Sequence, residues 1–393
     1  MFPERKISPI FSIGIEVTAL ERIIYADNAA TTKLDKAAFD AMTPWLLEEY
    51  GNASQPYTFA RKPKKALADA KAAIAECIGA APEEIYFTSG GTESDNWVIK
   101  SSAFSDSEKR ATITSAFEHH AILRSCAAIE RLGYPVAYMW PSEEGYITPE
   151  ILEKYITDNT RLVSVMFANN EIGSIQPVRE LCEAAHAHGA LFHTDAVQVV
   201  GHIKINVHDI GVDFLSASAH KFNGPKGIGF LYIRKGVELP PYIDGGAQEN
   251  THRAGTENVA AIIGMAVALK ENCNLLDQNQ QHILDLERLL LVQLDKAGAA
   301  YKCNGGAHKL PGLLSLSFPG KDGEAILHRM DLMGISVSTG SACDSVNTEI
   351  SHVLQAIRLD EEYAKGTIRI SLGKNNTKED IEKIATALIK IIA

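Results

Sequence analysis

The sequence predicts an α/β protein with one large domain on a mostly parallel mixed sheet and a smaller α+β domain. Its 393 residues can bury a sizeable core. Between Asp35 and Ile233, stretches with helical periodicity alternate with short β-rich runs, the pattern of helices that cover a parallel sheet. The hydrophobic share of 46% and charged share of 22% are those of an ordinary globular protein.

The predicted large domain spans residues 35–265. Its expected strands are Glu84–Phe87, Ala111–Ser115, Val136–Met139, Leu162–Phe167, Leu191–Thr194, Phe214–Ser218 and Gly229–Ile233. Helical patterns lie before and between them at Lys64–Ile78, Ala121–Leu132, Ile151–Ile156 and Val178–Ala187. Strands that alternate with helices in this way favour parallel pairing.

The predicted small domain combines residues 23–34 with residues 266–393, and residues 1–22 are expected to form an N-terminal extension. One long helical pattern runs from Asn258 to about Lys296. Three β-rich runs follow, accompanied by two further helices: Leu313–Phe318, Ile335–Val337 and Thr367–Leu372. A ligand site is expected between the domains, at the carboxyl ends of the parallel strands.

Charge and cysteine usage exclude several classes of function. Lys and Arg number 38 against 49 Asp and Glu, and 38 − 49 = −11 argues against a nucleic acid as main partner. The longest apolar run, Val259–Leu269, is shorter than the ~18 residues of a membrane helix. The six cysteines are scattered without a C-x-x-C pair, so we expect no metal site, and a reducing cytoplasm fits best.

A glycine-containing turn is the first candidate binding element. Thr88-Ser89-Gly90-Gly91-Thr92-Glu93 follows a predicted strand and opens a helix, where backbone N–H groups and the helix dipole attract an anion. The same residues also fit a plain strand-to-helix turn capped by Thr92. No G-x-G-x-x-G or G-x-x-x-x-G-K-[ST] pattern occurs, which disfavours a dinucleotide or a nucleoside triphosphate.

A lysine and an acid follow two other predicted strands. Lys221 comes after Phe214–Ser218, where partial desolvation would lower an amine pKa and favour Schiff-base chemistry; the alternative is a solvated surface lysine. Asp195 ends another strand and needs a partner if buried, such as the protonated nitrogen of a pyridine ring; an ordinary strand-end cap is the alternative. His119 offers a flat imidazole for stacking, or is a core histidine.

Together these residues indicate pyridoxal phosphate (PLP). The cofactor has one phosphate, one basic ring nitrogen and one aldehyde, which match the turn, the acid and the lysine.

Cys343 differs from the other cysteines. It lies in Ser341-Ala342-Cys343-Asp344-Ser345, a stretch of small and polar residues that predicts an exposed loop, where a thiolate can act as a nucleophile. Cys77, Cys126, Cys182 and Cys273 fall in helical patterns and are interpreted as filler, whereas Cys303 stays undecided.

From Ile24 onward the sequence resembles the cysteine desulfurases of the NifS/IscS family, which are fold-type I PLP enzymes. The residues that carry the resemblance are Tyr25-Ala26-Asp27-Asn28-Ala29-Ala30-Thr31-Thr32, Thr88 to Glu93, Glu118-His119, Ala168-Asn169-Asn170-Glu171-Ile172-Gly173, Asp195 to Gln198, Ser216 to Gly229, Gly245 to Glu249, Arg253 to Asn258, the Cys343 stretch and Ile368-Arg369-Ile370-Ser371-Leu372-Gly373.

The resemblance implies roles for individual residues. Lys221 would hold PLP as a Schiff base, Asp195 would pair with its ring nitrogen and His119 would stack on its ring. The remaining implied contacts are Gln198 and Asn170 near the ring hydroxyl; Gly91, Thr92, Ser218 and His220 at the phosphate; Thr256 at the phosphate of a neighbouring subunit in a homodimer; and Asn28, Asn170 and Arg369 at the substrate.

It also implies a reaction. L-cysteine would become L-alanine, with Lys221 or His119 moving protons and the sulfur held as a persulfide on Cys343. An acceptor protein such as an iron–sulfur scaffold would then take the sulfur, for iron–sulfur cluster assembly or tRNA thiolation. The stretch Val346–Ser351 departs from the Leu-Glu-Pro-Ser run that many members carry, which leaves the acceptor open.

Three other functions stay open at this point. A selenocysteine lyase or cysteine sulfinate desulfinase would share the fold and the cofactor. An aminotransferase of the same fold would need no loop thiol. A non-catalytic dimer with a vestigial pocket would bind no PLP.

Overall fold

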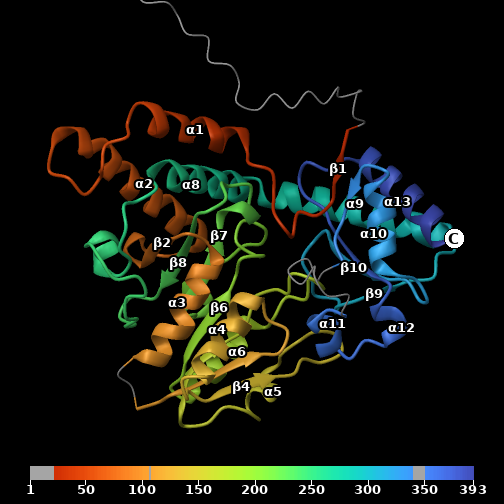
Figure 1. The fold of residues 1–393 in the computed structure, drawn as a ribbon, viewed down its shortest axis with the longest axis horizontal. Helices are drawn as coiled ribbons and strands as arrows, with labels where there is room; N and C mark the ends of the chain where they lie inside the picture. Colours follow the sequence, from red (N-terminus) through yellow and green to blue (C-terminus); the bar gives the residue numbers. More distant parts are fainter. Residues whose placement is uncertain (1–21, 106–107, 340–349) are drawn as a thin grey trace, which may run out of the picture.

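The computed structural model describes residues 22–105, 108–339 and 350–393. Residues 1–21 of the predicted N-terminal extension, and Cys343 with its neighbours, lie outside the described residues. Figure 1 shows the chain as two lobes, with the large sheet in one and the C-terminal strands and helices in the other.

The large lobe contains a seven-stranded mixed sheet in the order β2-β8-β7-β6-β5-β3-β4. Its strands are β2 (Ile85–Thr88), β3 (Ala111–Ser115), β4 (Val136–Met139), β5 (Thr160–Ser164), β6 (Leu191–Asp195), β7 (Phe214–Ser218) and β8 (Gly229–Ile233). The neighbours from β4 to β7 pair in parallel, whereas β8 runs antiparallel to both β7 and β2. The predicted mostly parallel mixed sheet is confirmed.

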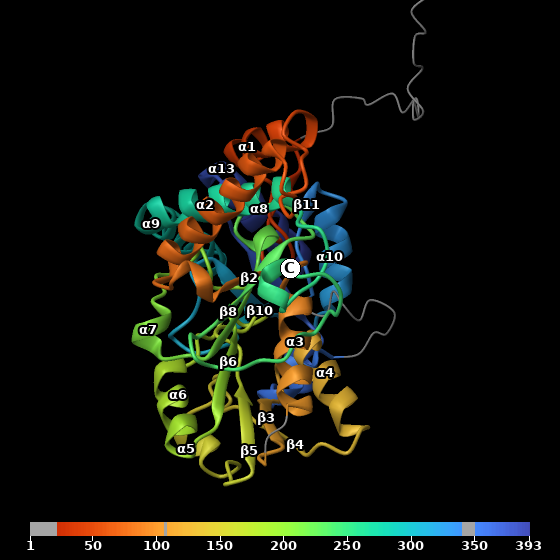
Figure 2. The same cartoon turned by 90° about the vertical axis from the view of Figure 1, so that its left-hand side faces the viewer.

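Helices cover both faces of this sheet. They are α1 (Lys36–Leu47), α2 (Arg61–Ile78), α3 (Gly91–Phe104), α4 (His120–Glu130), α5 (Pro149–Leu152), α6 (Val178–Ala187), α7 (Val207–Ile210) and α8 (Val259–Asn274). Figure 2 shows α3 and α4 on one side of the sheet and α5 and α6 on the other. Side chains alternate between the two faces, so Phe214 packs with Trp97 of α3 while Leu215 joins the opposite cluster. Every residue of β7 is therefore buried.

The single long helix expected from Asn258 to Lys296 is wrong. The chain forms α8 and then α9 (Leu276–Lys296), bent by 71°. Leu275 joins them in a non-helical conformation (φ −106, ψ 15), and two asparagines, which are poor helix formers, precede it. In the part of the chain that the structure describes, no single helix is long and apolar enough to cross a membrane; α8 and α9 meet the length and composition test only as this bent pair.

The smaller lobe holds an antiparallel sheet in the order β12-β10-β9 and a parallel pair, β1 with β11. Its elements are β1 (Ile24–Tyr25), β9 (Lys302–Cys303), β10 (Leu313–Ser317), α10 (Gly323–Asp331), β11 (Ile335–Ser336), α11 (His352–Ala356), α12 (Glu361–Ala364), β12 (Thr367–Ser371) and α13 (Lys378–Ile392). The short α11 and α12 come in addition to the two helices expected after the long one. A separate apolar cluster fills this lobe, and the segment after β1 crosses from it to α1.

Candidate active site

A cavity of about 490 Å³ lies at the carboxyl ends of β6 and β7, where the fold predicts a ligand site. The structure brings ten of the predicted residues to its wall: Gly91, Thr92, His119, Asn170, Asp195, Gln198, Ser218, His220, Lys221 and Arg369. Asn28 and Thr256 lie elsewhere, and Cys343 is outside the described residues. These ten come from six separate stretches of sequence, so the fold alone assembles them.

Lys221 stands at the end of the short 3₁₀ turn η3 (Ala219–Lys221), directly after β7. Its Nζ donates to the carbonyl oxygens of Ala29 and Ala30. The backbone is held from behind, because His202 Nε2 donates to the carbonyl of Lys221 (2.8 Å) and Asn272 Nδ2 donates to that of Phe222 (2.8 Å). Hydrogen bonds to both the side chain and the backbone of Lys221 therefore fix the position of the amine.

The part of the cavity wall formed by the start of α3 is suited to an anion. The first N–H groups of α3 have no acceptor within the helix, and the helix dipole adds partial positive charge there. A Cβ on Gly91 would lie 2.5 Å from Cγ2 of Val197, so only glycine fits the helix start so close to the segment after β6. His220, whose Nδ1 lies 3.1 Å from Thr31 Oγ1, lines the same cavity, and its burial lowers its pKa to about 4.

Asp195 and His119 lie close together in the cavity wall. Asp195 ends β6 and accepts the Val197 N–H at 2.9 Å, and burial raises its pKa. His119 caps α4, where its Nδ1 accepts the Ala121 N–H at 3.1 Å, so its remaining proton is on Nε2. Burial also lowers the pKa of His119, which keeps the ring neutral.

Two buried acids at this site were missed in the sequence. Asp95 lies one turn after Gly91 on α3, is fully buried, and its Oδ1 has no hydrogen-bond partner among the described residues. One oxygen of Asp95, one of Asp195 and a ring nitrogen of His119 lie within 4.8 Å of one another. Burial raises the pKa of Glu118, which precedes His119, to about 8. The only sequence signal was the helical spacing from Gly91 to Asp95.

Arg369 reaches the cavity from β12 of the smaller lobe. Its Nη1 donates to the carbonyl of Asn170 (2.9 Å) and its Nη2 pairs with Asp27 Oδ1 (2.8 Å). Its backbone N–H donates to the carbonyl of Ser338, just before the stretch that contains Cys343. After that stretch, His352 Nε2 donates to the carbonyl of Glu118 (3.0 Å). Both flanks of the Cys343 stretch are therefore tied to the site.

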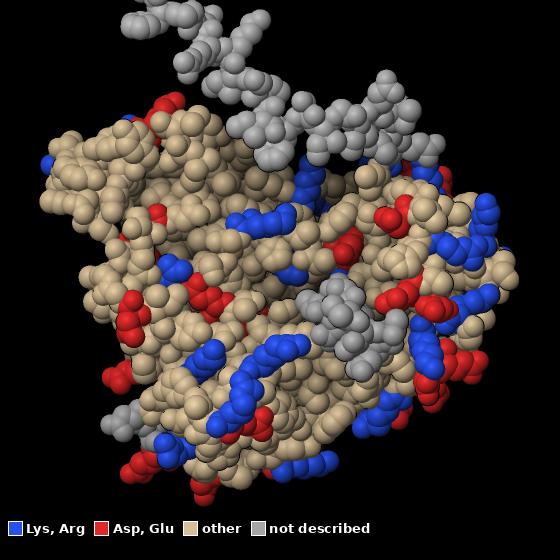
Figure 3. Space-filling model, in the orientation of Figure 1, with Lys and Arg blue, Asp and Glu red and all other residues tan. Residues whose placement is uncertain are grey.

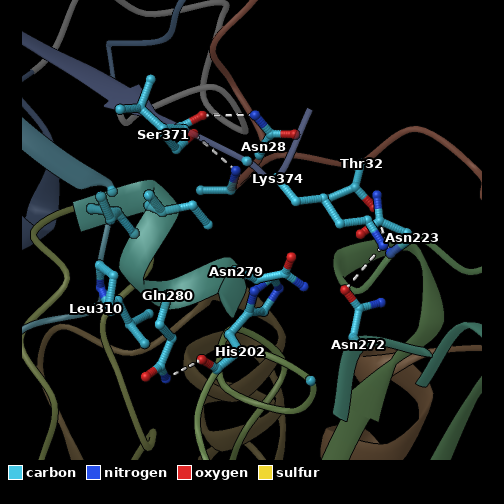
Figure 4. Close-up of a pocket in the computed structure, with 18 of the residues that line it drawn as sticks. Asn28, Thr32, His202, Asn223, Asn272, Asn279, Gln280, Leu310, Ser371 and Lys374 are labelled. Atoms are coloured by element: carbon cyan, nitrogen blue, oxygen red, sulfur yellow. Dashed lines mark hydrogen bonds between the residues drawn. The ribbon is translucent and has the colours of Figure 1, made fainter. Parts of the chain in front are cut away.

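Asn28 lines a neighbouring cavity, shown in Figure 4, which shares Ala29 and Gln198 with the main one. Asn28 Nδ2 donates to the carbonyl of Ser371 at 2.9 Å. This second cavity holds about 70 Å³, room for a few ordered water molecules between amide side chains. Asn28 is therefore tied to the end of β12, and its predicted substrate contact stays a prediction.

The residues present fit PLP. The cavity offers an amine for the aldehyde, a helix N-terminus for the phosphate and a flat neutral imidazole. The raised pKa of Asp195 is that of a buried carboxyl without a cationic partner, which a pyridinium nitrogen supplies.

Comparisons with known proteins agree with this arrangement. The aminotransferase class-V family model matches residues 24–384. The cysteine desulfurase IscS of Dictyoglomus turgidum is 47% identical over 375 residues, 95% of both chains, and that of Methanosarcina thermophila is 42% identical over 380 residues, 96% of this chain and 94% of the relative.

Solved structures extend the likeness to three dimensions. A NifS-like protein superimposes with a TM-score of 0.88 at 36% identity, over 94% of this chain and 99% of its own. A structure described as SspA in complex with cysteine gives a TM-score of 0.80 at 34% identity, over 90% and 100% of the two chains. The chain belongs to the class-V aminotransferase family, within its group of IscS- and NifS-like cysteine desulfurases.

Proposed function

We propose that this protein is a PLP-dependent cysteine desulfurase that converts L-cysteine to L-alanine and holds the sulfur as a persulfide on Cys343. The observation that carries the proposal is the convergence of Lys221, Asp195, His119, the α3 N-terminus and Arg369 on one cavity. An amine, an acid and an anion site suit PLP, and a guanidinium suits the carboxylate of an amino acid.

When bound, PLP supplies an aldehyde that captures the substrate amine and an aromatic system that accepts the electrons of a broken Cα–H bond. Asp195 would hold PLP through its ring nitrogen, and the positive charge of that nitrogen would favour the ionised carboxylate that burial alone disfavours. The Lys221 amine lines the cavity, where it takes up the Cα proton. His202 and Asn272 keep it in place by hydrogen bonds to the backbone carbonyls of Lys221 and Phe222. His119 presents Nε2–H to the cavity and can donate that proton to the substrate.

The substrate is recognised as an amino acid by its carboxylate. Arg369 lines the cavity and is almost fully buried, so an ionic contact there is screened little by water. The relative described in complex with cysteine supports cysteine as the ligand.

Sulfur transfer is assigned to Cys343. This residue is five positions after Ser338, so an extended chain spans at most ~17 Å between them, and Ser338 pairs with the backbone of Arg369. The thiolate attacks the substrate sulfur and forms an S–S bond. The substrate C–S bond breaks with its electron pair staying on carbon, which takes up a proton and becomes the methyl group of alanine.

We also propose a homodimer. Exposed apolar side chains gather on and just after α1, namely Phe39, Leu46, Leu47 and Tyr50. Figure 3 shows few charged side chains over this part of the surface. Such a patch is typical of a protein interface. Thr256 is exposed and outside the cavity wall, which suits a residue that contacts the cofactor of a neighbouring subunit.

The acceptor and the compartment belong to the same proposal. An iron–sulfur scaffold protein is the acceptor we propose. We also propose the cytoplasm as the compartment, because the cysteines described in the structure are free thiols, as expected in reducing surroundings.

Alanine release distinguishes this function from its alternatives. The purified protein, loaded with PLP, is given L-cysteine, selenocysteine or cysteine sulfinate, and alanine is quantified. We expect alanine from cysteine, lost in both Lys221→Ala and Cys343→Ala. Alanine from selenocysteine or sulfinate alone would indicate a lyase or desulfinase, and amino-group exchange with a 2-oxo acid would indicate an aminotransferase.

A further inference from the structure

The guanidinium of Arg369 is held by a carboxylate that does not itself line the cavity. Asp27 Oδ1 lies 2.8 Å from Nη2, and the side chains are 17% and 4% exposed, respectively. The two residues are separated by 342 positions in the chain. Asp27 is absent from the cavity wall, whereas Arg369 is part of it.

Hydrogen-bond donors remain on Arg369 after this pairing. A guanidinium has five N–H groups; Asp27 accepts one and the carbonyl of Asn170 accepts another. Three remain, and Nε is buried without a hydrogen-bond partner in the described part of the chain. A carboxylate that binds through two parallel hydrogen bonds needs two N–H groups of this kind.

The position of Asp27 is fixed by its backbone. It forms a β-bridge with Ser371, two residues beyond Arg369 in β12, and its carbonyl accepts the hydroxyl of Tyr25 at 2.9 Å. The carboxylate is therefore held beside the guanidinium by the register of the main chain.

We propose that Asp27 is a positioning residue for substrate recognition, which fixes Arg369 so that its remaining N–H groups meet the α-carboxylate of the amino acid. The inference rests on the proposed function, because it takes the ligand to be an α-amino acid. Fixing a long side chain in advance reduces the conformational entropy lost on binding. Asp27 also neutralises a guanidinium that is costly to bury alone.

The chain contains a matched control for this pair. Asp35 and Lys374 join the same two segments at 2.6 Å, with side chains 20% and 17% exposed. Neither residue lines the main cavity. Removing Asp35 therefore tests the structural effect of losing an ion pair between these segments without touching the substrate arginine.

The test uses the PLP-loaded protein with Asp27→Ala, Asp27→Asn and Asp35→Ala. We expect Asp27→Ala to raise KM for L-cysteine about tenfold, a loss of about 1.4 kcal/mol in binding, with kcat within about twofold of wild type. Asp27→Asn keeps an oxygen acceptor for the guanidinium, so its KM should lie between those of wild type and Asp27→Ala. Asp35→Ala lowers the thermal midpoint but leaves KM unchanged.

Inhibition by product analogues isolates the carboxylate. The inhibition constant of L-alanine rises with KM in Asp27→Ala, whereas that of L-alaninamide, which has no carboxylate, stays the same. An unchanged or lower KM in Asp27→Ala would overturn the inference. So would an equal rise in the inhibition constants of L-alanine and L-alaninamide in that variant, or a rise in KM in Asp35→Ala as large as that in Asp27→Ala. If Asp27→Ala fails to fold, Asp27→Asn decides. If the wild-type protein releases no alanine from cysteine, the proposed function fails before this comparison is made.

Discussion

Glu118 and His119 are neighbours in the chain, and burial shifts their pKa values in opposite directions. The carboxyl of Glu118 is fully buried, accepts the Ser115 hydroxyl and the Met166 N–H (3.0 Å), and has its pKa raised to about 8. The imidazole of His119 has its pKa lowered. Both side chains are therefore neutral near pH 7.

Glu118→Gln tests this protonation state through stability. The folded pKa lies above the ordinary value of 4.5, so the folded protein keeps a proton that the unfolded chain loses between about pH 4.5 and pH 8. The unfolding free energy of wild type therefore falls as pH rises through this window, by at most about 1.4 kcal/mol per pH unit. Glu118→Gln removes this fall.

Urea denaturation of both proteins at several pH values measures the difference. From pH 5 to pH 8 the unfolding free energy of the glutamine variant should rise relative to that of wild type. Above pH 8 the difference between the two proteins should stay constant. A difference that stays constant with pH would show that Glu118 is ionised in the folded protein.

Some site residues could be predicted from the sequence and others could not. Lys221 and Asp195 follow strands that run in parallel, so their convergence at one edge of the sheet follows from the strand pattern. Asp95 lies inside α3, and an aspartate within a helix is usually exposed, so its sequence position does not predict a buried site residue. Asp27 finds its partner 342 positions away, a contact that only the tertiary fold reveals.

Among the elements, the break between α8 and α9 combines weak helix propensity at Asn272 and Asn274 with the tertiary contacts of Asn272. The interruptions of the helical pattern here are polar residues, which a helix tolerates, so the sequence predicts one long helix. In the structure, Asn272 Nδ2 donates to the carbonyls of Ala268 and Phe222, and its Oδ1 accepts from Lys374 Nζ. Most strands were predicted within two residues because their β-rich runs are short and bounded by loops.

Asn272→Leu tests whether this helix end supports the lysine. The change removes the hydrogen bond to Phe222 and leaves its carbonyl without that donor, which costs about 1–3 kcal/mol of stability. Because Phe222 follows Lys221, PLP is expected to dissociate faster, by about threefold to tenfold.

Stopped-flow absorbance of the bound cofactor and thermal unfolding provide the two readouts. Asn274→Leu, an exposed asparagine two residues later, is the matched control and should leave both unchanged. Equal PLP release from the two variants would contradict the supporting role.

At the scale of the whole molecule, the two lobes contribute different parts of one site. The larger lobe supplies Lys221, Asp195 and the α3 N-terminus, and the smaller lobe supplies Arg369 and the strand that pairs with Ser338. The segment after β1 connects the two lobes. Within it, Asp27 forms an ion pair with Arg369, and Asp35 forms one with Lys374.

The proposed dimer is tested at the apolar patch on α1. Leu46 and Leu47 are 60% and 72% exposed, so a Leu46→Glu, Leu47→Glu double variant places charge at the proposed interface. We expect light scattering to give a dimer for wild type and a monomer for the variant. Leu332→Glu, at a leucine 86% exposed in the smaller lobe, should stay dimeric. A monomeric wild type, or a dimer that survives the double change, would contradict the interface.

Mass spectrometry of the PLP-loaded protein, after L-cysteine is added without a reductant, tests persulfide formation on Cys343 directly. We expect one additional sulfur atom on the peptide that contains Cys343, which appears together with the first equivalent of L-alanine. Lys221→Ala should show neither the sulfur atom nor the alanine. Alanine release with the extra sulfur on another cysteine, or with no sulfur retained on the protein, would contradict this role of Cys343.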